Sequence, residues 1–257
     1  MEQGISNYCF GNNICAIYKD STDSTNTDVK KLAENGASEG TLVISEHQTA
    51  GRGRLGKTFY SPKGCGLYFS LLLKPQIAPS NAYLLTVAAA VSMKRAIFHI
   101  FDKETQIKWV NDIYFNGKKF CGILTESAIE KSASLKYAVL GIGINIYPPE
   151  NGYPEEFAYK TTNLKEFTDS FPDDFKNKLL SKFLEEFFSI YENLENKEYV
   201  KEYRDSSCVT GKEIEILSGE HKGYASAIEI DDDANLLVKL KNGEIVSLSS
   251  GDISIRL

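Results

Sequence analysis

The segment from Gly51 to Gly56, which reads Gly-Arg-Gly-Arg-Leu-Gly, combines residue types that can grip an anion. Its three glycines lack Cβ atoms and permit positive φ, so successive backbone N–H groups can turn toward one phosphate. Arg52 and Arg54 add forked donors that match phosphate or carboxylate geometry. Each charge-assisted hydrogen bond contributes roughly 1.5 to 3 kcal/mol, which is enough for two arginines to hold a ligand. The loop predicts a nucleotide-using enzyme, and a solvent-exposed turn is the simpler alternative.

Residues 51–58 also fit the pattern Gly-x-x-x-x-Gly-Lys-Ser/Thr of P-loop NTPases. That pattern needs a helix that begins at its lysine, so that the helix N-terminus faces the phosphates. Pro62 and the glycines at 64 and 66 follow here and exclude a continuous helix. No later apolar strand ends in Asp as a Walker B strand does. A P-loop NTPase therefore stays only an alternative, as does a non-catalytic module that binds peptides through its C-terminal strands.

The bulk composition is that of a globular protein, with 257 residues, 42% of them hydrophobic and 25% charged. A net charge of -6 disfavours a duplex-DNA partner, whose phosphates must be neutralised by many Lys and Arg side chains. Residues 1–6 lack the basic and apolar parts of a secretory signal. The longest apolar run, near 84–91, falls below the roughly 20 residues that span a bilayer. We expect a cytoplasmic protein without nucleic-acid or membrane partners.

The cysteines and histidines are scattered along the chain. Cys9, Cys15, Cys65, Cys121 and Cys208 form no Cys-x-x-Cys pair, and the three histidines lie far apart. This spacing argues against a disulfide framework and against a structural zinc site. We expect reduced thiols and no metal site built from protein ligands.

The hydrophobic periodicity predicts an α+β fold in which a mixed β-sheet is flanked by helices. Strands are expected at 14–18, 41–45, 66–73, 106–110, 112–115, 120–127 and 137–146, with a hairpin turn at Asn116-Gly117. Helices are expected after Asp23, over 79–102 and over 172–194. From about residue 212 the pattern changes to five short strands, at 213–217, 224–230, 236–240, 244–248 and 253–256, which predict a small barrel.

Several short segments occur together with the Gly-Arg loop, and each is weak by itself. They are Ser24-Thr25-Asn26, Ser61-Pro62 ahead of Leu67-Tyr68, Lys108-Trp109-Val110-Asn111-Asp112, Lys119-Phe120-Cys121-Gly122-Ile123-Leu124, Glu126, and Gly141-Ile142-Gly143-Ile144-Asn145. In this order the set resembles the biotin protein ligases, and the resemblance extends to the last residues, 251–256. It implies a catalytic domain over 1–207 of the class II aminoacyl-tRNA synthetase and biotin ligase type. An SH3-like barrel over 208–257 would follow it.

The resemblance also implies a two-step reaction. The carboxylate of biotin attacks the α-phosphate of ATP, which arrives with Mg²⁺, and gives biotinyl-5′-AMP and pyrophosphate. A lysine of a biotin carboxyl carrier protein, part of a biotin-dependent carboxylase, then takes the biotinyl group. Positive groups that offset the repulsion between carboxylate and triphosphate would lower the barrier. A lipoate-type acyl-protein ligase is the nearest alternative, but lipoate ligases lack this Gly-Arg-Gly-Arg-x-Gly loop.

The resemblance assigns roles to particular positions. Lys119 would contact the carboxylate and the α-phosphate, Arg54 would assist it, and Asp112 would orient Lys119 or the Mg²⁺ ion. The positions implied for biotin are Ser24, Thr25, Asn26, Gln48, Gly51, Arg52, Lys119, Gly122 and Gly143. Those implied for ATP are Arg52, Gly53, Arg54, Leu55, Lys57, Phe59, Asn111, Lys119 and Asn145. Gly141, with Gly122 and Gly143, would let strands approach the bicyclic ring closely.

Some roles stay open at this point. Ser24 and Thr25 are also helix N-cap residue types, and Trp109 could pack beside the ligand or belong to the core. Phe59 stands where many relatives have Trp, and Val110 where many have Pro, which predicts a looser turn. Too few residues precede the first strand for a helix-turn-helix module, so no repressor function is expected. We expect a monomer or homodimer whose loop closes over biotin, with arginines that order only when ligand is bound.

Overall fold

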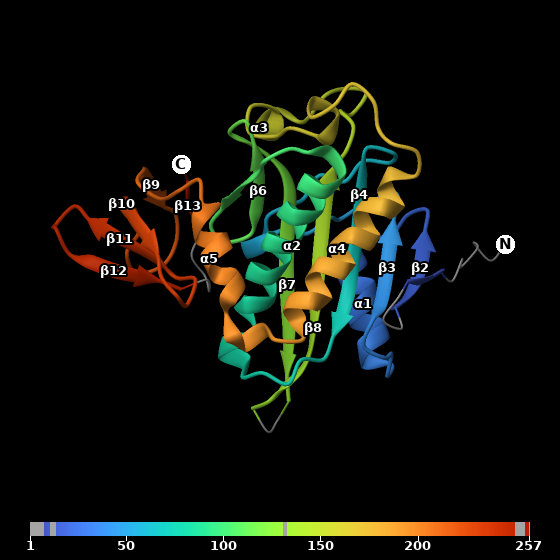
Figure 1. Ribbon diagram of the computed structural model, residues 1–257, viewed down its shortest axis with the longest axis horizontal. Helices are drawn as coiled ribbons and strands as arrows, with labels where there is room; N and C mark the ends of the chain where they lie inside the picture. The colour runs from blue at the N-terminus through green and yellow to red at the C-terminus, as the bar shows by residue number, and fades with distance from the viewer. Residues whose placement is uncertain (1–7, 11–13, 131–132, 250–254, 257) are drawn as a thin grey trace.

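An eight-stranded mixed β-sheet forms the centre of the protein (Figure 1). The computed structural model describes residues 8–10, 14–130, 133–249 and 255–256. The strand order is β1-β2-β3-β4-β8-β7-β6-β5, in which β2 and β3 run parallel and the other neighbouring pairs antiparallel. The strands are β1 (Tyr8–Phe10), β2 (Ile14–Lys19), β3 (Thr41–Ser45), β4 (Gly66–Leu73), β5 (Gln106–Lys108), β6 (Asp112–Phe115), β7 (Lys118–Ile129) and β8 (Leu135–Asn145). The predicted mixed sheet is confirmed.

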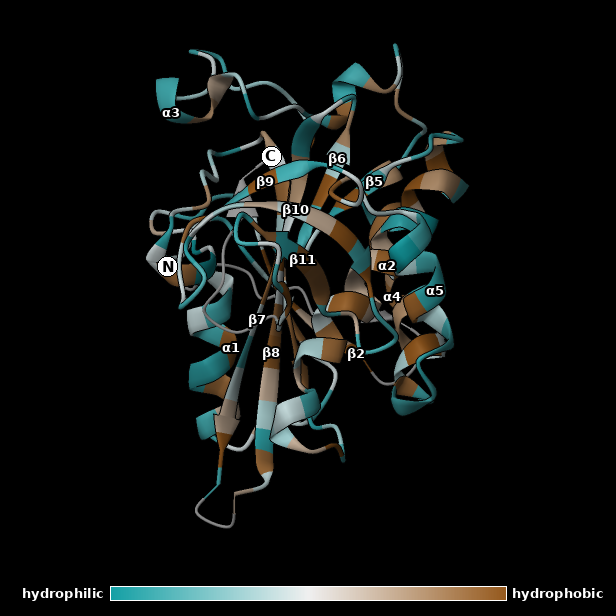
Figure 2. Cartoon of the chain, turned by 90° about the vertical axis from the view of Figure 1, so that its left-hand side faces the viewer, coloured by the Kyte–Doolittle hydropathy of each residue, from teal (hydrophilic) through white to brown (hydrophobic). Residues whose placement is uncertain are grey.

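Helices cover both faces of this sheet (Figure 2). One face carries α1 (Thr25–Glu34), and the other carries α2 (Tyr83–Phe101), α4 (Phe175–Tyr191) and α5 (Glu198–Asp205). A short helix, α3 (Glu155–Ala158), and four 3-10 turns, Arg54–Gly56, Pro79–Asn81, Leu164–Glu166 and Leu194–Asn196, complete the helical elements of the described residues. Because both faces are covered, every residue of the central strand β4 is buried, as its apolar run predicts.

The helix α2 is the most apolar element and packs against α4. By length and composition alone, the whole helix Pro79–Phe101 is long and apolar enough to cross a membrane, although the apolar run near 84–91 within it was expected to be too short. The same window is 67% buried inside the protein, as the core helix of a folded domain would be. Its partner α4 contributes Leu179, Phe183 and Phe187, which recur every four residues and are fully buried.

The hairpin between β6 and β7 turns at Asn116 and Gly117, whose φ angles are 50° and 75°. Phe115 and Lys118 form the closing pair, so the turn has two residues, and two positive φ angles are what Asn-Gly favours. The predicted hairpin is therefore confirmed. The preceding strand β5 is shorter than predicted, because it ends at Lys108 instead of 110.

A second, antiparallel sheet holds the C-terminal strands in the order β12-β11-β10-β9-β13. They are β9 (Glu213–Ile216), β10 (Gly223–Ile230), β11 (Leu236–Leu240), β12 (Ile245–Leu248) and β13 (Ile255–Arg256). The five predicted strands are thus present, although residues 253 and 254 of the last lie outside the described residues. The part of the chain that the structure describes shows no pairing between β12 and β13, so the predicted closure into a barrel is not shown.

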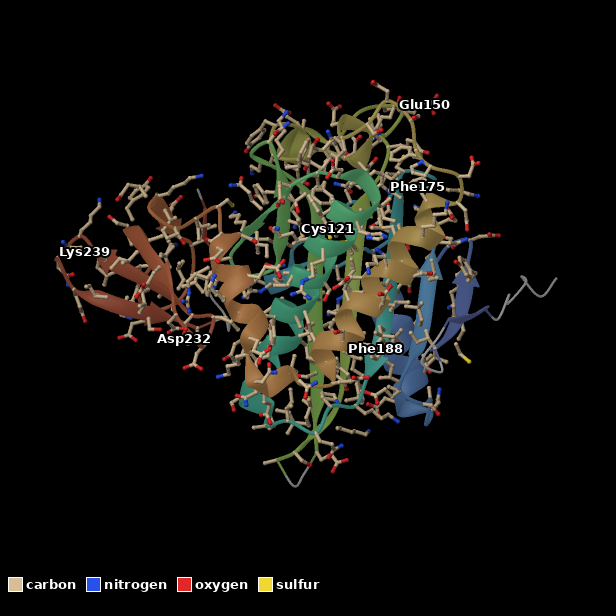
Figure 3. All side chains as sticks on the ribbon, in the orientation of Figure 1. Cys121, Glu150, Phe175, Phe188, Asp232 and Lys239 are labelled. Atoms are coloured by element: carbon tan, nitrogen blue, oxygen red, sulfur yellow. The ribbon has the colours of Figure 1, made fainter. Side chains whose placement is uncertain are left out.

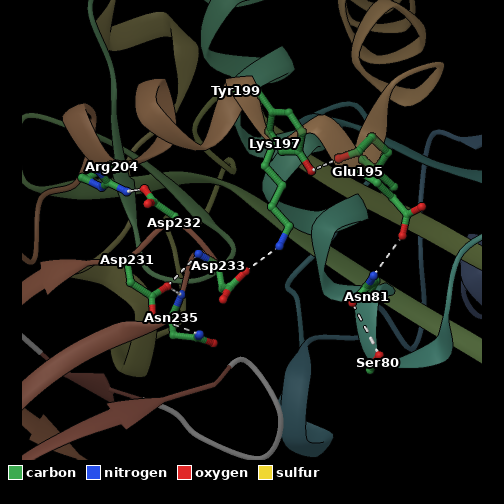
Figure 4. A network of polar contacts seen from close by, with 11 residues as sticks. Ser80, Asn81, Glu195, Lys197, Tyr199, Arg204, Asp231, Asp232, Asp233 and Asn235 are labelled. Carbon is green, nitrogen blue, oxygen red and sulfur yellow. Dashed lines mark hydrogen bonds and ion pairs between the residues drawn. The ribbon is translucent and has the colours of Figure 1, made fainter.

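The second sheet docks on the first through Trp109 and a group of ion pairs. The Trp109 indole is 3% exposed and donates from Nε1 to the carbonyl oxygen of Ala234, 3.0 Å away. Arg204 and Lys197 form ion pairs with Asp232 and Asp233 in the turn between β10 and β11 (Figure 4). Figure 3 places Asp232 at the end of the sheet that faces α5 and Lys239 at its far end. Trp109 therefore belongs to the contact between the two sheets.

The cysteines whose side chains are described are free thiols. Cys15 is exposed, Cys65 is half-buried, and Cys121 and Cys208 are buried. Cys9 lies in β1, where side chains are outside the described part. Figure 3 shows Cys121 near the middle of the molecule, and its burial raises the pKa of the thiol.

Replacing Trp109 by Phe should weaken the attachment of the second sheet. The substitution removes the donor to the Ala234 carbonyl, and a buried carbonyl left without a partner costs about 1–3 kcal/mol. We expect a loss of this size in the free energy of unfolding, measured by circular dichroism because the only tryptophan is lost. Residues 231–248 should become more sensitive to proteases.

The control is Tyr203→Phe, which removes the hydroxyl that donates to the Val110 carbonyl, 2.8 Å away, within the first part of the chain. It should lower stability to a similar extent without exposing the second sheet to proteases. Equal protease sensitivity in the two variants would contradict the docking role of Trp109.

Candidate active site

A cavity of about 670 Å³ opens on the face of the sheet that carries α1. Its walls come from six places: the start of α1, Gln48 after β3, the Gly-Arg loop with Thr58 and Phe59, the segment from β5 to β8, the segment 156–161, and Leu217 after β9. A second cavity, of about 690 Å³, lies between α2, α4 and α5 and is lined by other residues. All the residues expected for biotin, ATP and catalysis line the first cavity, except Gly51 and Asn145.

Strand register builds the floor of this cavity. Tyr68 pairs with Gly143, Gly143 with Gly122, Gly122 with Asp112, and Asp112 with Lys108. Directly paired residues on neighbouring strands point to the same face, so these five positions form one row across the sheet. The row has two glycines at its centre and charged side chains at one end. The strands therefore contribute no side chains at the middle of the floor, and the floor is charged at the β5 edge.

The space above the glycines is used by three side chains of the protein. A Cβ atom at Gly143 would lie 2.4 Å from the Phe59 ring, and one at Gly141 would lie 1.9 Å from Oδ1 of Asn26. A Cβ at Gly122 would lie 2.9 Å from Nζ of Lys119. The glycines thus make room for side chains that line the cavity. From the sequence we expected them to make room for the bicyclic ring of the ligand instead.

A β-bulge directs Lys119 into the cavity. Ile113 pairs with Cys121 but Tyr114 pairs with Lys119, so β7 contains one extra residue at this point. In a regular strand Lys119 and Gly122 would point to opposite faces, because they are three residues apart. The bulge places both on the cavity face and leaves Phe120 and Cys121 buried in the core.

Lys119 forms an ion pair with Asp112, whose Oδ1 lies 2.6 Å from Nζ. The prediction that Asp112 orients this lysine therefore agrees with the geometry. The backbone of Lys119 is held as well, since its N–H donates to the Lys160 carbonyl at 2.8 Å and its carbonyl accepts from the N–H of Thr162 at 2.8 Å. Both ends of the residue are fixed before any ligand is present, which favours a preorganised cation.

At the start of α1, the helix is capped from another segment. Gln48 Oε1 accepts hydrogen bonds from the backbone N–H and the hydroxyl of Thr25, at 2.9 and 3.2 Å. Ser24 occupies the N-cap position but makes no capping hydrogen bond with its side chain. Ser70 donates to Thr25 and Asn26 from below, at 2.7 and 2.6 Å. Simple N-capping therefore does not explain Ser24, which leaves its hydroxyl for the cavity.

The Gly-Arg loop is a closed hairpin. The N–H of Gly53 donates to the Lys57 carbonyl at 2.7 Å, and that of Phe59 donates to the Gly51 carbonyl at 2.9 Å. Lys57 is extended, with φ -69° and ψ 151°, so no helix begins there. The P-loop alternative requires that helix and is excluded. The hairpin brings the Phe59 ring over the glycine floor.

Glu126 anchors the loop to the sheet. Its carboxylate lies 2.9 Å from the Arg52 guanidinium and 2.6 Å from the Lys30 amine, and it accepts a hydrogen bond of 2.8 Å from Asn26. Burial alone would raise the pKa of Glu126, but the hydrogen bonds from Lys30 and Asn26 and the charges of Lys30 and Arg52 lower it overall. Arg52 is thus held by a carboxylate of the protein, a contact that the loop sequence does not reveal.

Two expected residues lie beside the cavity and support its walls. Gly51 is buried, and a Cβ there would lie 2.3 Å from the Phe59 carbonyl oxygen, so only glycine lets the loop close. The Asn145 amide donates to the Thr162 carbonyl at 3.2 Å and so holds the segment that pairs with Lys119. Neither position is among the residues that line the cavity.

The structure adds lining residues that the sequence did not single out as site residues. They are Lys108, Tyr114, Glu156, Phe157, Lys160, Thr161 and Leu217, beside Thr58, Ile123, Leu124 and Ile142. Trp109, which the sequence left open between ligand and core, also lines the cavity. Lys108 could have been found, because it belongs to the same short segment as Asp112, which it faces as an antiparallel partner. Leu217 had no local signal, since its place depends on how the second sheet docks.

Comparison with known proteins places the chain among ligases. Residues 18–145 match the biotin/lipoate A/B protein ligase family, and residues 209–256 match the biotin protein ligase C-terminal domain. The biotin--[acetyl-CoA-carboxylase] ligase of Mycobacterium tuberculosis is 30% identical over 238 residues, which cover 90% of this chain and 85% of that protein. The bifunctional ligase/repressor BirA of Bacillus subtilis is 41% identical over 150 residues, and the match spans 46% of its length.

Solved structures agree with this placement. The Aquifex aeolicus biotin protein ligase R40G mutant in complex with biotin has a TM-score of 0.79 and 30% identity, with 94% of this chain and 97% of that chain covered. The same ligase in complex with biotin and ATP has a TM-score of 0.75 and 30% identity, with 94% and 98% covered.

Replacing Glu126 by Gln should loosen the Gly-Arg loop. The amide keeps the shape but removes the charge that holds Arg52 and Lys30. We expect trypsin to cleave faster after Arg52, Arg54 and Lys57, and mass spectrometry of the fragments would measure this rate. Glu34→Gln is the control, because it removes the same charge from an ion pair with Lys136 elsewhere on the sheet. Unchanged cleavage in the Glu126 variant would contradict the anchoring role.

The Glu126 carboxylate also predicts a pH dependence. Its pKa is lower in the folded protein than in the unfolded chain, so the unfolded chain binds the proton more readily. Its contribution to stability is therefore present above the unfolded pKa and is lost as the pH falls through the folded one. Glu126→Gln should make the acid limb of the stability curve shallower, as measured by urea unfolding at pH values from about 3 to 6.

Proposed function

The chain belongs to the biotin protein ligase family, and from that membership we propose that it activates biotin with ATP and transfers it to a carrier protein. The observation that carries this proposal is the Lys119–Asp112 ion pair beside a glycine floor, under an arginine-bearing loop. The pair offers a fixed cation next to open space large enough for a small bicyclic molecule and a nucleotide. The first product would be biotinyl-5′-AMP, with release of pyrophosphate.

Biotin would bind at the start of α1, beside the Phe59 ring that covers the glycine floor. Ser24, Thr25 and Gln48 present polar groups at one end of the cavity, which suits the ureido ring of biotin. The Phe59 ring over Gly143 offers an apolar surface for the acyl chain. With the bicyclic ring of biotin at the start of α1, the carboxylate of biotin would point toward Lys119, along the row of paired strand positions.

Lys119 would bring two anions together. The carboxylate of biotin and the α-phosphate repel each other, and one fixed ammonium that contacts both lowers the cost of their approach. Arg52 and Arg54, on the hairpin above, would add charge on the opposite side. The loop would also keep water from the reactive adenylate.

Mg²⁺ would enter with the nucleotide. The described residues contain no group of three or more His, Cys, Asp or Glu side chains that would bind a metal by themselves. Asp112 and Glu156 are the carboxylates that line the cavity, and Mg²⁺ commonly uses one or two carboxylates together with phosphates. The ion would supply charge neutralisation of the triphosphate.

The partner would be the carboxyl carrier domain of a biotin-dependent carboxylase, as the names of two relatives suggest. We propose that the catalytic part covers 1–207 and that 208–257 close into an SH3-like barrel. The protein would act in the cytoplasm as a monomer or homodimer, without nucleic acid. The matched family also includes lipoate ligases, so lipoate stays the second candidate substrate.

Pyrophosphate exchange tests the proposed reaction. Incubation with ATP and labelled pyrophosphate should return label to ATP only when biotin is present, because the adenylate forms only on biotin. A parallel assay with lipoate decides between the two acyl groups. Exchange without biotin, or exchange driven by lipoate alone, would overturn the proposal.

Replacing Lys119 by Ala should abolish adenylate formation while the fold is kept. Loss of a preorganised charge at the reacting centre commonly reduces the rate about 10²- to 10³-fold. Lys118→Ala is the matched control, since Lys118 precedes Lys119 in β7 and is exposed away from the cavity. The measurement is the biotin-dependent exchange rate, with circular dichroism to verify folding. Near wild-type exchange in the Lys119 variant would remove this lysine from the site.

A further inference from the structure

Lys108 is a cavity cation without an anionic partner. Its amine forms no ion pair and no hydrogen bond with any residue that the structure describes, and its recorded contact is the face of the Tyr114 ring, 5.7 Å from the centroid. By contrast, Lys119 is paired with Asp112. Lys160, which lies over the Tyr159 ring at the cavity, is exposed and remains solvated. Lys108 is half-buried, so it has lost part of its hydration without gaining a counter-charge.

This arrangement is costly unless an anion binds there. A desolvated ammonium is less stable than a hydrated one, and burial accordingly lowers the pKa of Lys108, an effect that the charge of Asp112 offsets only in part. The Asp112 carboxylate cannot fully neutralise it, because Asp112 already lies 2.6 Å from Lys119. The site around Lys108 is therefore short of one negative charge.

The position of Lys108 indicates which part of a ligand would supply that charge. It is the last member of the row that runs from Gly143 through Gly122 and Asp112, two strands beyond the glycine floor. Neighbouring strands are about 4.8 Å apart, so the backbone of Lys108 lies about 10 Å from that of Gly122, and the Lys108 side chain lines the same face of the sheet. If the α-phosphate of ATP lies at Lys119 and biotin approaches it from the α1 side, the β- and γ-phosphates would extend toward Lys108 at the other end of the row.

We propose that Lys108 binds the β- and γ-phosphates of ATP, and hence the pyrophosphate that leaves. The inference rests on the proposed adenylation. In that step a carboxylate oxygen bonds to the α-phosphorus while the bond from this phosphorus to the bridging oxygen of the β-phosphate breaks. The electron pair departs with pyrophosphate, and Lys108 stays protonated throughout. Its charge offsets the negative charge that grows on the leaving group.

The two half-reactions, adenylation and transfer, distinguish a residue that binds the leaving phosphates from a residue that supports the whole reaction. Pyrophosphate takes part in adenylation but not in the transfer of biotin from the adenylate to the carrier. A residue that binds only the leaving phosphates should therefore matter for the first half-reaction alone. Lys119, which would contact the α-phosphate, has no such restriction.

The experiment compares Lys108→Met, Lys108→Arg and the control Lys118→Met in the full-length protein. Lys108→Met should reduce biotin-dependent pyrophosphate exchange about 10- to 100-fold, the loss expected for one charge-assisted hydrogen bond. It should raise the pyrophosphate concentration needed for half-maximal exchange. Transfer from purified biotinyl-5′-AMP to a carrier domain should stay within about two-fold of wild type. Arginine should restore most of the exchange, because the charge is retained.

The outcomes are distinct. Unchanged exchange in Lys108→Met, or an equal loss in both half-reactions, would overturn the inference. If Lys108→Arg fails to restore exchange although it folds, the side chain acts by shape and the inference also fails. Absence of biotin-dependent exchange in the wild-type protein would instead contradict the proposed function, which makes the two failures distinguishable.

Discussion

The close approach of side chains to three glycines on two neighbouring strands is the constraint on which the site depends. Gly122 lies opposite Gly143, and Gly141 lies one pleat further along β8. Phe59, Asn26 and the Lys119 amine occupy the space that Cβ atoms would need. A larger residue at any of these three positions would push out the loop, the start of α1 or the lysine. The glycine floor therefore fixes the three walls of the cavity relative to one another.

Charge is distributed over this floor in pairs. Arg52 is held by Glu126 and Lys119 by Asp112, so two cations that face the cavity are positioned by carboxylates of the protein. Such pairing holds a side chain at a defined place and lessens repulsion between neighbouring cations. It also means that an arriving anion meets prepared partners and does not have to order them all. Lys108 departs from this pattern, because it forms no ion pair with any residue that the structure describes.

The second sheet is connected to the site through one short stretch of chain. Residues 108–112 contain a cavity cation, the tryptophan that donates to Ala234, and the carboxylate that pairs with Lys119. A shift of the second sheet would therefore act on Trp109 and on its neighbours in β5 and β6. Leu217 completes the wall near that stretch. This connection gives a physical reason for a small C-terminal sheet to influence chemistry on the larger one.

The sequence by itself determined most of the elements, because alternation and helical spacing are local rules, whereas the site residues were inferred from a resemblance carried by several short segments. Alternation and helical spacing predicted the strands and helices, Asn116-Gly117 predicted its hairpin, and Pro62 argued correctly against a P-loop helix. Only the tertiary structure decided how these parts meet. The bulge that turns Lys119 into the cavity, the Glu126 contact of Arg52 and the place of Leu217 depend on pairing between distant segments. Such register is set by the free energy of many long-range contacts together, and no local window of sequence contains it.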